Sequence, residues 1–240
     1  YQVEPFLEKL LEIHDFFASG GRPGNLKAGS SWHTVYTAER DATEALFHFY
    51  RISVGGTFEE IVEAVKKFAR ADARRFAVRD QMRAAAIVEA LRRDKKYYVE
   101  AGLIHYPLFL DLRKRLPPGY ALGVTFLMAG AVREMGYRTH LYGPGDLLTL
   151  LYRFHPKRRD PEDDLLAARA LVYNKLIAKE EIEESPEPYP HTRDELETSA
   201  VVRRLTLDEC RRLFSEVRRA PTQTAREKVR NYLGQKGRTG

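Results

Sequence analysis

The chain has 240 residues, of which 43% are hydrophobic and 31% are charged, and its formal net charge is +6. These values are typical of a globular protein with a buried core and exclude a wholly disordered chain. No apolar run reaches the roughly 18 residues that span a bilayer, and the first residues lack a secretory pattern, so we expect a cytoplasmic protein without a membrane partner. Because Cys210 is the only cysteine, an intrachain disulfide and a cysteine-cluster metal site are excluded.

The N-terminal part of the chain is predicted to be helical. Apolar residues at helical spacing indicate a helix over residues 4–17, and a second helix is expected over residues 37–50, after a loop rich in glycine. Thr57 and Glu60 then form a capping box ahead of an amphipathic helix that includes residues 58–69.

A further helix is predicted over residues 72–93, and its apolar face contains a carboxylate. Counting along one face gives Phe76, Asp80, Ile87 and Leu91, so Asp80 projects from the same side as apolar residues. A buried carboxylate without a hydrogen bond or an opposite charge is strongly destabilising. We therefore expect the fold either to pair Asp80 or to use it.

The middle of the chain is predicted to alternate between strands and helices. Aromatic and β-branched residues indicate strands over residues 97–103, 121–126 and 137–141. Helices are expected between them, over residues 106–116 and 127–136. This alternation predicts an α/β fold class: a small parallel or mixed sheet covered by many helices, with a basic helical appendage at the C-terminus.

Three regions are expected along the chain. Residues 1–184 form a helix-rich α/β core domain, whose last helix starts after the N-cap Asp160 and runs to about Glu184. Residues 185–200 form a connector, because their prolines interrupt a helix. Residues 201–240 form the basic helical appendage.

The arginines of the appendage are the candidate nucleic-acid contacts. They are Arg211, Arg212, Arg218 and Arg219, and their guanidinium groups suit phosphate. They support an alternative function, in which a non-enzymatic binding or scaffold protein docks nucleic acid or an acidic protein partner through its C-terminal helices. The other interpretation is a solvated basic face, because no recognised DNA- or RNA-binding module is present.

Two short stretches carry polar residues where apolar ones are expected, and they resemble a known superfamily. The stretches are "VRDQMRAAAI" at residues 78–87 and "VEAGLIH" at residues 99–105. Over about residues 57–142, the chain resembles the superfamily of erythromycin esterase-like, ChaN-like haem-binding and TraB/GumN-type proteins. The residues that match its helix and its following strand end are Arg79, Asp80, Met82, Ala101, Gly102 and His105.

The resemblance implies a cleft at the end of a strand. In the superfamily, the matching histidine and charged helix residues line a hydrolytic or ligand-binding site, which an N-terminal Gly-Glu-x-His motif completes. This chain contains no such motif, and Trp32-His33 is the nearest substitute. An alternative is that the chain is a partner subunit, and that another polypeptide supplies the missing motif.

His105 is the central candidate residue. A neutral imidazole can act as a general base, a metal ligand or an axial haem ligand, so a divalent metal or haem is the candidate cofactor. Asp80 and Glu100 are the other catalytic candidates, because a carboxylate can fix the tautomer of such a histidine. The expected ligand-binding residues are Arg79, Met82, Tyr106 and His140.

The leading hypothesis is a small-ligand or metal-binding protein, with a metal-dependent hydrolase as its enzymatic form. It predicts that His105→Ala removes binding and leaves the thermal stability nearly unchanged. The structural alternative has Asp80 paired with Arg79 or Arg83, Glu100 bound to backbone groups at a sheet edge, and His105 capping the next helix.

Overall fold

The structure, a computed structural model, describes residues 3–92, 94–182 and 185–236, and within these ranges it is helical. No strand pairs among the described residues, so the predicted α/β class with a small sheet is wrong. Residues 97–102, 121–126 and 137–141 leave the helices without joining a backbone ladder. Their composition suits a strand, but a strand is stable only beside a hydrogen-bonded neighbour.

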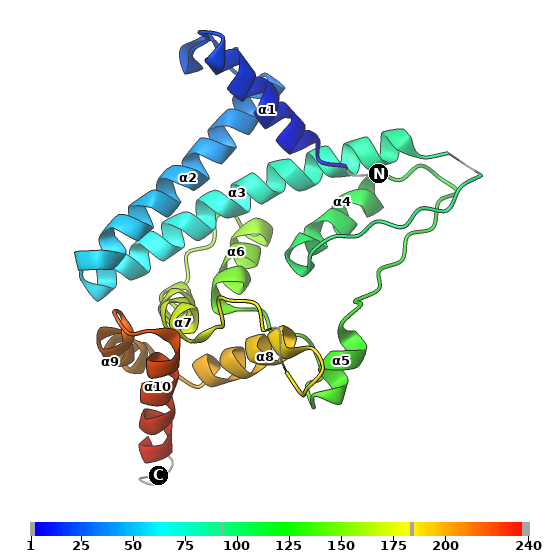
Figure 1. Ribbon diagram of the computed structural model, residues 1–240. Coiled ribbons are helices and arrows are strands. Elements are labelled where there is room, and N and C mark those ends of the chain that lie inside the picture. Colours follow the sequence, from blue (N-terminus) through cyan, green and yellow to red (C-terminus); the bar gives the residue numbers. More distant parts are fainter. Residues whose placement is uncertain (1–2, 93, 183–184, 237–240) are drawn as a thin grey trace.

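The helices are numbered in chain order as in Figure 1. Their bounds are α1 Pro5–Ala18, α2 Ser31–Gly55, α3 Phe58–Ala90, α4 Tyr106–Arg115, α5 Ala129–Glu134, α6 Pro144–Phe154, α7 Glu162–Leu176, α8 Pro190–Arg203, α9 Leu207–Val217 and α10 Thr222–Lys236. Short 3-10 turns cover Pro23–Asn25 and Leu103–His105. None of the described helices combines the length and the apolar character that crossing a membrane requires.

Helix α3 is the spine of the molecule. It begins at the expected capping box, in which Thr57 Oγ1 accepts a hydrogen bond from the Glu60 backbone and the Glu60 side chain accepts one from the Thr57 backbone. It continues through residues 70–72, where two separate helices were predicted to meet, because this stretch contains no helix-breaking residue. Helices α1, α2, α4, α6 and α7 all pack against it (Figure 1).

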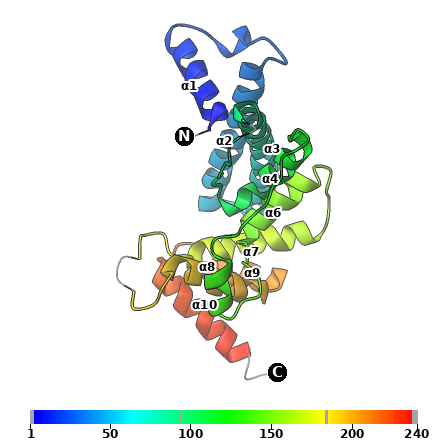
Figure 2. The same ribbon diagram turned by 90° about the vertical axis from the view of Figure 1, so that its right-hand side faces the viewer.

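Three clusters of buried apolar residues hold the helices together. The largest joins α3, α6 and α7 to α9 and α10. A second cluster joins α1 and α2 to α3 through Phe6, Ile13 and Val35. The third is small and joins α3 to α4 through Ala84, Leu108 and Leu112. In the view of Figure 2, α1 lies at one end of the molecule and α8, α9 and α10 lie at the other.

The C-terminal helices belong to the largest cluster. Helix α7 ends at Leu176, before the predicted end at Glu184, and α8 occupies most of the predicted connector over residues 185–200. Helices α9 and α10 bury Leu213, Val217 and Val229 in the same core as α3 and α7. The predicted helix end at Glu184 and the last four residues of the predicted appendage lie outside the described residues.

Glu209 links α9 to α10 and gives α9 a pH-dependent contribution to stability. Its carboxylate accepts hydrogen bonds from the Thr206 backbone and the Tyr232 hydroxyl, and lies 2.6 Å from Lys236 Nζ. Partial burial raises the pKa of Glu209, but the hydrogen bonds from Lys236, Thr206 and Tyr232 outweigh it and lower this pKa to about 2. The ionised carboxylate therefore stabilises the folded state above the unfolded value of 4.5.

Glu209→Gln is expected to lower the free energy of unfolding by about 1–2 kcal/mol near neutral pH. Because the folded pKa lies below the unfolded one, the difference from wild type should shrink as the pH falls from 4.5 toward 2. Urea denaturation at several pH values measures it. The control is Glu216→Gln, which removes an exposed ion pair with Arg212 and should cost less than about 0.5 kcal/mol. An E209Q deficit that does not change below pH 4.5 would contradict this assignment.

Candidate functional site

The candidate site lies where α4 begins against α3. His105 closes the turn Leu103–His105 and immediately precedes α4, whose first turn contains Pro107. Leu108 and Leu112 on α4 pack against Ala84 on α3, so the start of α4 is held against the α3 face that carries Asp80. The third apolar cluster therefore positions the histidine.

His105 and Asp80 form a buried pair. His105 Nδ1 lies 2.7 Å from Asp80 Oδ1. Asp80 is 0% exposed, whereas 11% of the His105 side chain is exposed. The ring of Phe76 stands edge-on to the imidazole, at 5.1 Å between ring centroids. The fold thus pairs the carboxylate that the sequence places on an apolar helix face with the histidine that begins the next helix.

The pair engages Nδ1 of His105, and Nε2 makes no hydrogen bond with the described residues. When Nδ1 carries the proton, it donates to Asp80, and Nε2 keeps a lone pair for a proton or a ligand. Asp80 Oδ2 is buried and has no hydrogen-bond partner among the described residues. A buried carboxylate oxygen without a partner destabilises the fold. The contact with His105 is therefore the main interaction that offsets the cost of burying Asp80.

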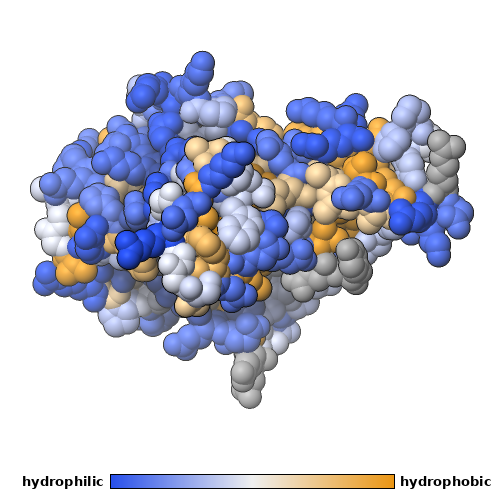
Figure 3. Space-filling model, turned by 90° about the horizontal axis from the view of Figure 1, so that it is seen from above, coloured by the Kyte–Doolittle hydropathy of each residue, from blue (hydrophilic) through white to orange (hydrophobic). Residues whose placement is uncertain are grey.

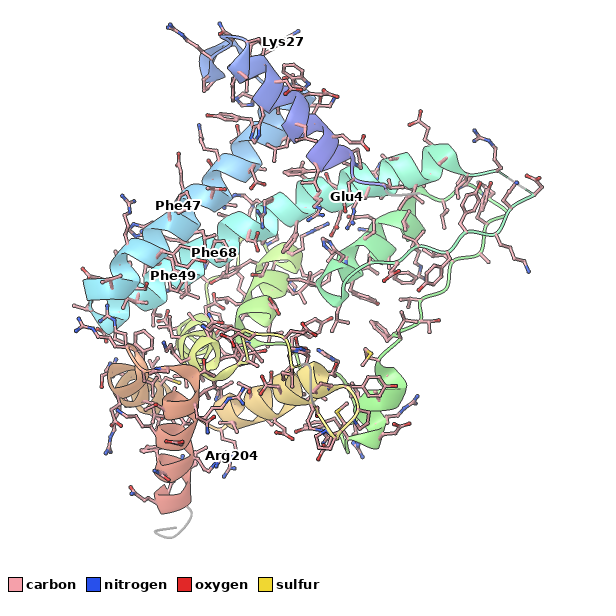
Figure 4. All side chains as sticks on the ribbon, in the orientation of Figure 1. Glu4, Lys27, Phe47, Phe49, Phe68 and Arg204 are labelled. Carbon is pink, nitrogen blue, oxygen red and sulfur yellow. The ribbon has the colours of Figure 1, made fainter. Side chains whose placement is uncertain are left out.

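Arg79 is occupied by a different carboxylate. Its guanidinium binds Glu4 through two hydrogen bonds of 3.0 and 2.9 Å, and Arg83 donates to the same carboxylate. Glu4 is 7% exposed and lies between the start of α1 and α3 (Figure 4). These contacts join the N-terminal helix to α3 and place Arg79 in a structural cluster, and neither arginine pairs with Asp80.

The other candidates near the pair do not meet His105. Glu100 is exposed in the extended segment before the turn. Met82 packs into the α1–α2–α3 cluster, on another face of α3. Tyr106 stacks on Phe109 and Phe126. Of the three predicted catalytic residues, the structure therefore brings together two, Asp80 and His105.

His140 and Trp32-His33 lie in separate surroundings. His140 is 3.9 Å from Glu195 of α8 and contacts the ring of Tyr142. Burial lowers the pKa of His140, and the charge of Asp146 acts in the opposite direction. Trp32 packs on Phe16 near the C-terminal end of α1, away from Glu4, so the residue pair "WH" does not complete the candidate site.

A resident metal does not fit the described side chains. No group of three or more His, Cys, Asp or Glu side chains gathers where it would hold an ion, within the parts of the chain that the structure describes. At His105, the neighbouring carboxylate already binds Nδ1, which leaves one free nitrogen. Two open grooves lie elsewhere, one along α2 at Phe47 and Tyr50 and one beside α4 at Phe109 and Pro117. Neither is lined by His105, so they offer no haem slot against its ring.

The predicted nucleic-acid arginines are mostly engaged within the chain. Arg211 pairs with Glu59 and Asp208, and Arg212 lies 3.5 Å from Glu216. Arg218 donates to the carbonyl oxygens of Ser53, Ile52 and Gly56, at the C-terminal end of α2. Arg219 is exposed and makes no ion pair with the described residues. Three of these four arginines therefore contact acidic or carbonyl groups of the same chain.

Arg218→Ala is expected to lower the free energy of unfolding by about 2 kcal/mol. The substitution removes charge-assisted hydrogen bonds from three carbonyl groups at a helix terminus, together with a guanidinium packed on Phe214. Arg219→Ala is the matched control, with the same charge change and an expected effect below about 0.5 kcal/mol. Chemical denaturation of both variants measures the difference. Equal stabilities would show that Arg218 does not cap α2.

The contacts of two residues around the site could not be predicted from local pattern. Glu4 contacts Arg79 across a separation of 75 residues, and nothing in its local pattern marks it. Phe76 was placed on the Asp80 face, but its contact with His105 depends on the packing of α4.

Comparisons with known proteins give one relative. The chain is 30% identical over 217 residues to a protein of Archaeoglobus fulgidus described as an "Uncharacterized protein". The match covers 89% of this chain and 69% of that protein. No family model matches the chain, and no solved structure matches it significantly.

Proposed function

We propose a function for this chain, which belongs to the same family as the Archaeoglobus fulgidus protein, from its geometry, because the description of that protein names no activity. The chain has a small-ligand site at the α3–α4 junction, and His105 Nε2 acts there as a general base in hydrolysis. The pairing of His105 Nδ1 with the buried carboxylate of Asp80 at 2.7 Å carries this proposal. Such pairing is the usual means of holding a catalytic imidazole in one tautomer.

The chemistry follows from the two nitrogens. Nε2 accepts a proton from a water molecule or a substrate hydroxyl, and the buried Asp80 carboxylate stabilises the imidazolium that forms. Phe76 contacts the imidazole, with the two ring planes nearly perpendicular at 83°. The activated oxygen then attacks an electrophilic centre such as an ester carbonyl, and a tetrahedral intermediate forms. When it collapses, the carbon–oxygen bond to the leaving alcohol breaks, and the alcohol oxygen takes the proton back from Nε2.

His105→Asn is the variant that tests the proposed role. The asparagine amide can still donate a hydrogen bond to Asp80, but it cannot act as a base. The variant therefore keeps the buried hydrogen bond and lacks the basic nitrogen Nε2. Initial rates are measured with p-nitrophenyl acetate and p-nitrophenyl butyrate. We expect wild type to turn over one of these esters, and H105N to lose roughly 10²- to 10⁴-fold in kcat/KM.

The control for this test is His14→Asn, because His14 is exposed on α1 and lies in no cluster. It should keep the wild-type rate. Equal rates in wild type and H105N, or no turnover of either ester by the folded protein, would contradict the hydrolytic role. The nucleic-acid alternative has less support, because Arg218 is committed to three carbonyl groups at the end of α2.

A further inference from the structure

Helix α2 carries apolar side chains on two opposite faces. Its inner face contains Val35, Ala42 and Phe49, which are buried or pack against the apolar clusters. Phe47 and Val54 lie on the opposite face and are 59% and 70% exposed. Figure 4 shows Phe47 on the side of α2 that faces away from α3. The outer face of a surface helix is ordinarily polar, so α2 departs from the usual pattern.

The two exposed apolar residues belong to a stripe along the outer face of α2. The stripe consists of Arg40, Glu44, Phe47, Arg51 and Val54, all of them exposed. At 3.6 residues per turn, these positions fall within an arc of roughly 80°. Toward the left-hand end of Figure 3, where α2 ends in Figure 1, hydrophobic residues lie among hydrophilic ones. Alternating steps of four and three residues are the spacing with which one helix packs along another.

An open groove lies in the middle of the stripe. It is lined by Glu44, Phe47, Tyr50 and Arg51, and Tyr50 is itself 53% exposed. When two helices pack together, a side chain of one enters a hole formed by four residues of the other. The groove has this form, because all four lining residues come from one helix.

The charged residues of the groove are weakly engaged within the chain. Arg51 makes no ion pair or hydrogen bond with another described residue and is exposed. The Glu44 side chain is 70% exposed and lies 3.8 Å from Arg40 Nε, whereas Arg40 lies closer, at 2.9 Å, to Asp41. An acid and a base therefore flank Phe47 along the helix. This charge pattern is complementary to itself when the direction of the helix is reversed.

We infer that the outer face of α2 is a self-association surface, on which the α2 helices of two copies of this chain pack antiparallel about a twofold axis. With the axis between positions 47 and 48, residue 44 of one copy lies opposite residue 51 of the other, so two ion pairs between Glu44 and Arg51 form. Residue 47 then lies opposite residue 48, where Phe47 of each copy enters the groove of the other. A parallel pair of helices would place like charges together.

The size of the surface fits a weak dimer. Stable interfaces usually bury about 800 Å² on each partner, and one helix with three exposed large side chains offers less. The expected dissociation constant is therefore in the micromolar range. Helix α2 contains neither Asp80 nor His105, so a failure of this inference would leave the proposed function untouched.

Sedimentation equilibrium of the 240-residue chain tests the inference. Wild type should show a monomer–dimer equilibrium at micromolar concentrations. Glu44→Arg and Arg51→Glu should each weaken the dimer roughly tenfold or more, because each homodimer then contains two like-charge contacts. The double variant Glu44→Arg/Arg51→Glu exchanges the charges, restores both opposite-charge contacts and should recover most of the wild-type affinity.

A mixture of the two single variants distinguishes the antiparallel contact from non-specific association. E44R has arginine at both positions and R51E has glutamate at both, so one chain of each kind pairs through two opposite-charge contacts. The mixture should form a heterodimer, although neither variant dimerises well alone. No heterodimer in the mixture would overturn the inference.

Phe47→Ser removes the side chain that enters the groove and should weaken the dimer roughly tenfold. Phe154→Ser is the matched control, because Phe154 is 43% exposed at the end of α6, and it should dimerise like wild type. Thermal unfolding shows that each variant is folded. A wild type that stays monomeric throughout the micromolar range would overturn the inference and leave the stripe to a different partner. A dimer that neither charge reversal weakens would also overturn it, because another surface would then hold the two copies.

Discussion

Asp163→Ala is expected to lower the free energy of unfolding by about 3–5 kcal/mol, the largest loss of stability that the structure predicts. Asp163 is 2% exposed, at the start of α7. It accepts hydrogen bonds from the Tyr152 hydroxyl at 3.0 Å and from Arg158 Nε at 2.7 Å. Arg70 lies 3.6 Å from the same carboxylate and stacks over the Tyr152 ring at 3.8 Å.

The loss is large because one substitution removes a buried carboxylate that several groups share. Without it, the buried Tyr152 hydroxyl loses its acceptor, and Arg158 and Arg70 each lose their most buried partner. Arg158 keeps Asp160 and Glu162, and Arg70 keeps the Arg158 carbonyl. Because these residues connect α3, α6 and α7, the largest apolar core loses the polar cluster at its edge. The deficit is measured by urea denaturation of the variant and wild type under one set of conditions.

Asp164→Ala is the matched control for Asp163→Ala. Asp164 is the next residue, carries the same charge and pairs with Lys66 at 2.6 Å, but its side chain is 46% exposed. Exposed ion pairs contribute between 0 and about 1 kcal/mol, so D164A should stay close to wild type. Similar losses in the two variants would contradict the role given to the buried cluster.

His105→Ala is expected to cost about 3 kcal/mol of stability, whereas His105→Asn should cost less than about 1 kcal/mol. On sequence alone, the alanine variant is predicted to keep its stability, but the structure changes that expectation. Asp80 is fully buried, and His105 is its hydrogen-bond partner among the described residues. Alanine leaves the carboxylate uncompensated, whereas asparagine replaces the donor.

The comparison of the alanine and asparagine variants also separates stability from function. Thermal unfolding should place H105N near wild type and H105A well below it, while both lose the base at Nε2. The double variant Asp80→Asn/His105→Ala removes the buried charge and should recover part of the stability that H105A loses. A stable H105A protein would mean that Asp80 is compensated by something other than His105.

Most helices were predictable from local pattern, although α8 was predicted to be a connector, whereas the predicted strands did not form. The capping box at Thr57 marks a true helix start, because both partners lie within one turn of the chain. Residues 97–103 carry strand-like side chains, but whether they form a strand depends on a neighbour far away in sequence. The predicted α/β fold class was wrong for this reason. Amino-acid composition indicates a preference for strand conformation, but a strand forms only when another strand pairs with it.

The candidate site was predictable in part. Asp80 stood out because a carboxylate on an apolar helix face needs a partner, and the structure supplies His105. Glu100 stood out for the same reason, but its segment is exposed, so its carboxylate needs no partner. The binding of Arg79 to Glu4 was not predictable, because the orientation of α1 on α3 results from apolar packing around Phe6 and Val35.

The tautomer of His105 is the most direct test of the central claim, that Asp80 holds Nδ1–H and leaves Nε2 free to act. Nitrogen-15 NMR of the imidazole in wild type and Asp80→Asn distinguishes the two neutral forms at a pH where the ring is uncharged. The pairing at 2.7 Å predicts a proton on Nδ1 in wild type, and the loss of this preference in D80N. A proton on Nε2 in wild type, or one tautomer shared by both proteins, would contradict the account.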